Sequence, residues 1–144
     1  MANEKPTEQE AERLIKARKI VSASVTWKSE NGSWRLEATA LEPKSNTILR
    51  ITGYIGKHNY SFCVLHRNYT IRKYTKHFRH KYKDKIYTEP HKHKWNERED
   101  DAETYIPDDI DPKANINDQF LAFCKECAID LKGNYQRVLY ELIR

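Results

Sequence analysis

The residues of this chain best suited to chemistry are its histidines. Five of the six lie between positions 66 and 93, and a single residue separates His91 from His93. In an extended segment, side chains at i and i+2 point to the same side, so these two imidazoles are expected to face one space, with Lys92 opposite. Histidine is the usual acid or base near neutral pH. His80, His91 and His93 are therefore the candidate catalytic residues.

The chemistry that fits these residues is metal-independent cleavage of RNA. That reaction needs a base for the 2′-hydroxyl proton, an acid for the leaving 5′-oxygen and a cation for the phosphorane charge. Arg79, Lys92 and Tyr87 lie close to the histidines in the sequence and supply the remaining group types. The alternative is that neutral histidines only form hydrogen bonds to phosphate. Zinc takes three or four ligands and the nearby lysines repel a cation, so no metal and no other cofactor is expected.

The charge around the histidines is strongly biased. Residues 66–95 contain ten Lys or Arg against two acidic residues, and aromatic side chains are interleaved with them. Cations that neutralise phosphate, beside aromatic faces that stack on bases, are typical of a single-stranded nucleic-acid site. The candidate nucleic-acid contacts are Arg72, Lys73, Tyr74, Arg79, Tyr82, Lys92, Lys94 and Trp95.

Residues 96–112 reverse that charge, with eight acidic residues against one arginine. The acidic run could act as a lid that competes for the basic surface, as its intramolecular counter-charge, or as a docking site for a basic protein partner. Composition alone leaves these three interpretations open.

Other function classes lack their motifs. The chain has four glycines and none of the glycine-rich patterns of nucleotide-binding loops or serine hydrolases. Three cysteines do not make a secreted disulfide framework, and Cys124 and Cys127 fall on an apolar helical stripe that indicates core packing. No apolar run is long enough to span a bilayer and the N-terminus lacks a signal sequence, so we expect a cytoplasmic protein with no membrane partner.

The elements that position this chemistry begin with a helix. Residues 7–10 have the form of a capping box, followed by helical spacing that ends near Ile20. Alternating patterns then predict five strands joined by short turns, the first of which is the hairpin turn at Asn31 and Gly32. The predicted strands cover residues 23–27, 34–40, 47–55, 60–66 and 69–75.

Helical spacing returns near the C-terminus. One helix is predicted from a cap at Asn117 and Asp118 to Gly133, and a second from Tyr135 to Ile143. The expected fold is α+β, a single domain over residues 1–144, in which the helices pack on one face of a five-stranded antiparallel meander. Residues 1–6 are expected to be a flexible tail, and residues 76–112 a long connection, basic and then acidic.

One short motif resembles a known family. Pro90-His91-Lys92-His93, preceded by the meander and by the Arg72-Lys73-Tyr74 strand, is similar to small bacterial toxin–antitoxin toxins with a Pro-His-x-His motif. The stretch that continues to Trp95 also resembles uncharacterised proteins of phage and bacterial defence loci. The resemblance covers residues 60–95 and implies a growth-arresting toxin, an RNase in some members, paired with an antitoxin.

Three functions therefore remain open at this point. The first is an RNA-directed nucleic-acid-binding protein that acts as a metal-independent endoribonuclease toxin. The second is a non-enzymatic binding or inhibitor protein of a bacterial or phage defence system, which acts through its basic and acidic surfaces. The third, which the nearby lysines disfavour, is a His-ligated metalloenzyme with His80, Glu89 or Glu97 as a third ligand.

Overall fold

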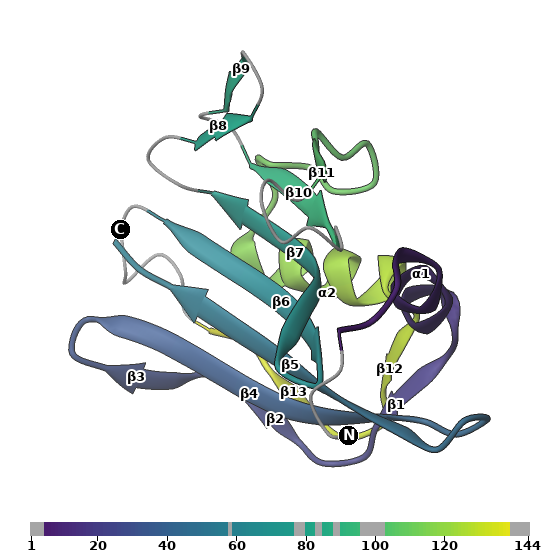
Figure 1. Cartoon of the computed structure of the whole chain (residues 1–144). Coiled ribbons are helices and arrows are strands. Elements are labelled where there is room, and N and C mark those ends of the chain that lie inside the picture. Colours follow the sequence, from purple (N-terminus) through teal and green to yellow (C-terminus); the bar gives the residue numbers. More distant parts are fainter. Residues whose placement is uncertain are drawn as a thin grey trace.

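A computed structural model describes residues 5–57, 59–76, 80–82, 85–87, 90–95 and 103–138, of which 80–82, 85–87, 103 and 104 are described by their backbone alone (Figure 1). Its elements are α1 (Glu8–Lys16), β1 (Lys19–Val21), β2 (Val25–Thr26), β3 (Lys28–Glu30), β4 (Ser33–Glu42), β5 (Thr47–Ile55), β6 (Tyr60–His66), β7 (Tyr69–Lys76), β8 (His80–Tyr82), β9 (Lys85–Tyr87), β10 (His91–Lys94), β11 (Glu103–Tyr105), α2 (Ile116–Glu126), β12 (Ile129–Leu131) and β13 (Tyr135–Gln136). The fold is α+β, as predicted.

The largest sheet is bigger than the predicted five-stranded meander. Its strand order is β11-β10-β7-β6-β5-β4-β1-β12, with β3 paired to β4. The run from β4 to β7 matches the last four predicted strands. The predicted first strand over residues 23–27 is wrong, because Val25–Thr26 pairs with β13 in a separate sheet and β3 pairs with β4 in its place. The predicted hairpin turn between β3 and β4 is present, with Asn31 at φ 50° and Gly32 at φ 83°. Positive φ at both positions matches the right-handed twist of the flanking strands. That part of the prediction is confirmed.

The first helix begins where the sequence predicts and ends earlier. The Thr7 hydroxyl accepts a hydrogen bond from the Glu10 amide at 3.0 Å, which caps the helix. The helix ends at Lys16, because Lys19 turns back and donates its buried ammonium to the carbonyls of Leu14, Ile15 and Ala17. A cation at this end satisfies carbonyls that have no helical partner.

The C-terminal predictions are partly wrong. The helix α2 begins after the cap Asn115 and ends at Glu126, with Cys127 as its C-cap, because Ala128 adopts φ 56° and redirects the chain. Ile129–Leu131 then pairs in parallel with β1, and Tyr135–Gln136 pairs with β2 instead of starting a helix. Residues 139–143 of the predicted second helix lie outside the described residues. Neither of the two helices that the described residues form is long and apolar enough to cross a membrane.

The predicted connection over residues 76–112 contains regular structure. Its described parts include the β8–β9 hairpin and two strands of the large sheet, β10 and β11. β10 runs antiparallel to β7 and places the histidine motif inside a sheet. The predicted tail also ends earlier than expected, because the buried Pro6 accepts a hydrogen bond from the Trp95 indole at 2.8 Å.

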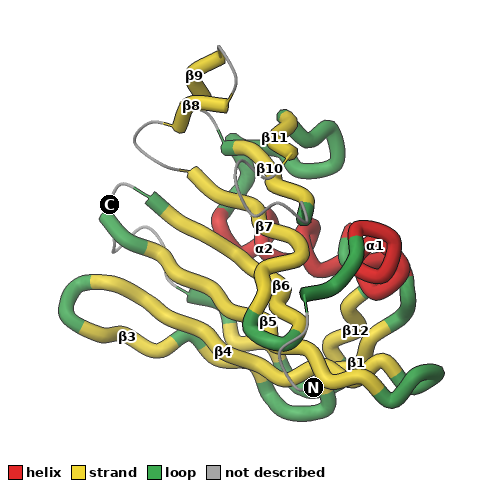
Figure 2. The backbone as a smooth tube through the Cα atoms, viewed as in Figure 1, coloured by secondary structure: helices red, strands yellow, loops and turns green. Residues whose placement is uncertain are grey.

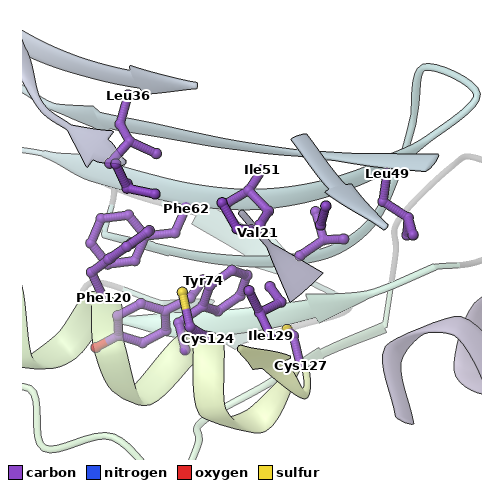
Figure 3. Close-up of a cluster of buried hydrophobic side chains, with 14 of the residues drawn as sticks. Val21, Leu36, Leu49, Ile51, Phe62, Tyr74, Phe120, Cys124, Cys127 and Ile129 are labelled. Atoms are coloured by element: carbon purple, nitrogen blue, oxygen red, sulfur yellow. The ribbon is translucent and has the colours of Figure 1, made fainter. Parts of the chain in front are cut away.

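The core lies between the sheet and its helices. α2 packs beneath the central strands, and the labelled side chains fill the layer between them (Figure 3). Figure 2 shows the helices gathered on one side of the curved sheet. α1 shares this side with α2, because Arg72 of β7 contacts Glu12 of α1 and Glu126 of α2. We call this the inner face. The opposite side of β3–β7 and β10, which the described helices leave uncovered, is the outer face.

Candidate nucleic-acid interface

The two histidines of β10 lie on the outer face. Their ring centroids are 4.8 Å apart and the rings meet edge to face, while Lys92 between them points to the inner face. This arrangement follows from the i, i+2 spacing in a strand. His91 is completely buried and His93 is half-buried, so His93 is the more accessible imidazole of the pair.

The neighbouring strands complete the surroundings of the histidine pair. Thr75 of β7 lies directly opposite His91, and Lys73 lies directly opposite His93. Directly opposed residues in antiparallel strands share a face, with Cβ atoms about 5 Å apart. Lys73 is half-buried, and its side chain leaves the backbone on the same face as His93, directly opposite it.

The registers of the strands extend this face across the sheet. Two rows of opposed residues run from β10 back to β4, with side chains that form hydrogen bonds or carry charge. The rows are His91, Thr75, Ser61, Tyr54 and Arg35, and His93, Lys73, Cys63, Thr52 and Glu37. Lys28 of β3 lies opposite Arg35, and Arg50 of β5 lies in the next row. Among the described residues, four cationic side chains therefore line the outer face, Lys28, Arg35, Arg50 and Lys73, against the carboxylates of Glu30 and Glu37.

Ion pairs on the outer face are long and exposed. Arg35 lies 3.9 Å from Glu30, and Arg50 lies 3.6 Å from Glu37, with every side chain at least 45% exposed. Exposed pairs of this kind contribute about 0–1 kcal/mol. They hold these cations only weakly, so an anionic ligand can compete for them.

Three predicted nucleic-acid contacts are instead interior residues. Arg72 and Lys92 are 3% and 1% exposed, and Tyr74 is completely buried with its hydroxyl donating to Gln119 at 2.7 Å. Positions 72, 74 and 92 point to the inner face because they alternate with Lys73, Thr75 and His91. Buried side chains with protein partners are not available to phosphate, so their assignment as nucleic-acid contacts is wrong.

Both buried cations, Arg72 and Lys92, form ion pairs with carboxylates. Arg72 is paired with Glu12 and Glu126, and Lys92 bridges Asp109 at 2.8 Å and Glu126 at 2.9 Å. Burial by itself would lower the pKa of Arg72, but the nearby carboxylate charges, chiefly that of Glu126, hold it above its ordinary value. These are buried charges that the fold itself neutralises.

The described part of the acidic run takes part in this network. β11 adds a strand beside β10, and the Tyr105 hydroxyl lies 3.4 Å from the Arg72 guanidinium. Asp109 supplies a carboxylate to Lys92. Of the three interpretations left open by the sequence, intramolecular counter-charge is the one these contacts support.

The remaining predicted residues are placed as follows. Lys94 lies over the Tyr105 ring at 5.1 Å, and Trp95 packs edge to face on Tyr69 at 5.4 Å; both are half-buried. Arg79 lies outside the described residues, as do the side chains of His80 and Tyr82. Of the predicted sites, the structure therefore brings His91, His93 and Lys73 together on one face.

The sequence reading missed the contribution of the earlier strands. Lys28, Arg35 and Arg50 lie far from the histidine-rich segment in sequence and join its face through the sheet register. The alternation of apolar and polar residues in β4 and β5 could have indicated this, because the polar side chains of each strand must point away from the core. Only the strand order showed that this side is continuous with β10.

The cysteines behave as core residues where the sequence predicted it. Cys124 and Cys127 are buried, and burial raises the pKa of Cys124 to about 12. Among the described residues, no group of three His, Cys, Asp or Glu side chains is arranged to hold a metal ion.

Comparison with known proteins places the chain in a family. No curated protein and no solved structure matches it. Residues 7–129 match the model of a family of unknown function, DUF6978. Because this match spans most of the sequence, from the cap of α1 to the start of β12, the chain belongs to the DUF6978 family.

Proposed function

We propose that the outer face binds single-stranded RNA. The observation that carries the proposal is the continuity of this face, which joins His93 and Lys73 at one end to Arg35 and Arg50 at the other. Cations on a sheet surface contact the phosphate backbone, and the partly exposed hydroxyls of Thr52, Tyr54 and Ser61 between them can donate hydrogen bonds. The resemblance of residues 60–95 to toxin–antitoxin toxins supports RNA as the target class.

Cleavage without a metal is the chemistry that the β10 end supports. His93 is half-buried and its Nε2 atom is enclosed, so it would exchange a proton with a bound phosphodiester only after binding uncovers the ring. Lys73, directly opposite His93, would then neutralise the charge of the phosphorane. His91 is completely buried against His93, which makes it a positioning residue for that imidazole. The observation that favours this second function is the pairing of two imidazoles with an ammonium group on one face.

Salt dependence tests the binding proposal. Labelled single-stranded RNA is incubated with the protein in EDTA over a range of salt concentrations, and retention and cleavage are read from the same samples. Because each phosphate contact contributes about −0.7 to the slope of log K against log salt, Lys73→Gln is expected to reduce that slope by about 0.7. Lys113→Gln, an exposed lysine before α2, is the matched control and should leave it unchanged. Salt-insensitive binding by the native protein would refute the proposal.

The same samples test the chemistry. If the protein cleaves RNA, His93→Ala abolishes cleavage and retains most of the affinity. His91→Ala should shift the pH profile of cleavage, because it acts through the neighbouring imidazole. Cleavage that persists in His93→Ala, or an absence of cleavage by the native protein, rejects the catalytic role and leaves the binding proposal to its own test.

A further inference from the structure

A pocket lies on the outer face at the end away from the histidines. Its volume is about 370 Å³. Small-molecule sites start at roughly 300 Å³, so the outer-face pocket can hold one aromatic ring system. It is lined by Thr26, Lys28, Glu30, Arg35, Leu36, Glu37, Thr52 and Gly53.

The lining of this pocket offers both kinds of hydrogen-bonding group. Glu30 and Glu37 are acceptors, and Lys28 and Arg35 are donors. The Glu30–Arg35 contact of 3.9 Å is too long for a hydrogen bond, and both side chains are more than half exposed. A ligand that presents donors to the carboxylates and acceptors to the cations can therefore replace water without breaking a strong contact.

A flat stacking platform borders the pocket. The Arg35 guanidinium lies over the Tyr54 ring at 4.9 Å from its centroid. This contact holds the guanidinium beside the pocket, where a planar ligand can stack on it. Bases of single-stranded RNA are bound on such guanidinium and aromatic planes.

We propose that this pocket binds a guanine base, an inference that rests on the proposed RNA-binding function. Guanine presents two adjacent N–H donors on its Watson–Crick edge, which match one carboxylate, and the acceptors O6 and N7 on its other side, which match Arg or Lys. Uracil has one N–H donor, and adenine and cytosine place an acceptor beside their amino group. The pairing of Glu37 or Glu30 with Arg35 thus selects guanine among the four bases.

The pocket and the histidine pair can engage one RNA strand. Arg35, Tyr54, Ser61, Thr75 and His91 are consecutive members of one row across the sheet. Four strand spacings of about 4.8 Å place the two ends of the row about 19 Å apart. A few nucleotides span that distance, so a guanine in the pocket would set which phosphate lies beside His93.

Two oligonucleotides test the proposal. Affinity of the native protein is measured by fluorescence anisotropy for an oligouridine and for the same oligomer with one central guanine. We expect at least tenfold tighter binding of the guanine-containing oligomer, the discrimination usual for a two-bond base contact. The variant Glu30→Gln with Glu37→Gln should bind both oligomers equally, and the control Asp118→Asn on α2 should keep the preference.

Each outcome separates the pocket from the proposed function. Equal affinities in the native protein, or a preference that survives the double substitution, overturn the guanine pocket and leave RNA binding in place. If neither oligomer binds, the proposed function fails. The pocket is then tested alone by titrating guanosine and uridine monophosphates while following Tyr54 and Thr52 by NMR, and the absence of selective shifts with guanosine monophosphate overturns it.

Discussion

Replacing Lys92 by methionine distinguishes a buried structural cation from a phosphate contact. The Lys92 side chain is 1% exposed and bridges two carboxylates, those of Asp109 and Glu126. Methionine keeps most of the apolar length of the side chain and removes the charge. We expect Lys92→Met to destabilise the fold and to leave the RNA affinity of the folded protein unchanged.

The magnitude follows from what remains after the charge is removed. Breaking a fully buried ion pair costs about 3–5 kcal/mol, because the other partner is left uncompensated. Here Asp109 and Glu126 are 39% and 21% exposed, and Glu126 keeps its contact with Arg72. Partial solvation and the remaining partner reduce the expected cost to about 2–3 kcal/mol. For a chain of this length, that loss lowers Tm by roughly 6–12 °C.

Urea denaturation and thermal melting, both followed by circular dichroism, measure this effect. Lys94→Met is the matched control from the same strand, because Lys94 is half-buried and lies over the Tyr105 ring. That contact is worth about 0.5–1 kcal/mol, so its loss should be clearly smaller. Combining Lys92→Met with Asp109→Asn should cost less than the sum of the two changes, because the second removes the carboxylate that the first leaves unpaired.

One result would refute this reasoning. The refuting result is that Lys92→Met retains native stability and binds RNA more weakly, with a reduced salt slope. Lys92 would then be a phosphate contact, and its ion pairs with Asp109 and Glu126 would contribute nothing to the free energy of unfolding. The sequence alone favoured that outcome, and the inward direction of the side chain argues against it.

Three further changes test separate parts of the fold. Hydrogen bonds from Ser45 and neighbouring groups lower the pKa of Glu42 to about 2, so Glu42→Gln should lower Tm at pH 7, and the difference should fade as pH falls from about 4.5 towards 2. A Cβ atom on Gly53 would lie 2.4 Å from the Trp27 ring, so Gly53→Ala should destabilise the protein by about 1–3 kcal/mol in urea denaturation. Cys63 is half-buried on the outer face and Cys124 is buried on α2, so a thiol reagent should modify Cys63 first in the folded state, as measured by mass spectrometry.

Each of these changes has a contradicting result. A Tm difference for Glu42→Gln that is constant from pH 7 to pH 2 would show that the charge of the Glu42 carboxylate does not contribute to the stability of the fold. Native stability in Gly53→Ala would mean that the Trp27 ring moves aside at no cost. Rapid modification of Cys124 in native buffer, with Cys63→Ser as the control, would contradict the packing of α2 on the sheet.

Local patterns predicted strands β4 to β7 correctly, and the first strand of the meander and the ends of the chain less well. Strands β4 to β7 were predictable because each alternates apolar and polar residues and is joined to the next by a short turn. Helical spacing around Cys127 and Leu131 was misleading, since Ile129–Leu131 is equally compatible with a strand of three residues. Pairing with β1, more than a hundred residues earlier, decided between the two.

The sequence by itself determined the α+β class, the cap of α1, the turn at Asn31 and Gly32, and the shared direction of His91 and His93. All of these depend on neighbours within a few residues. Only the tertiary structure decided which basic residues remain accessible. Strand order and register place the side chains of Arg72 and Lys92 on the inner face, beside carboxylates of α1, α2 and the acidic run. They place Lys73 on the opposite face, in the row between those of Arg35 and Arg50. The sequence shows where charged residues lie along the chain, but the face of the sheet to which each side chain points depends on how distant strands pair.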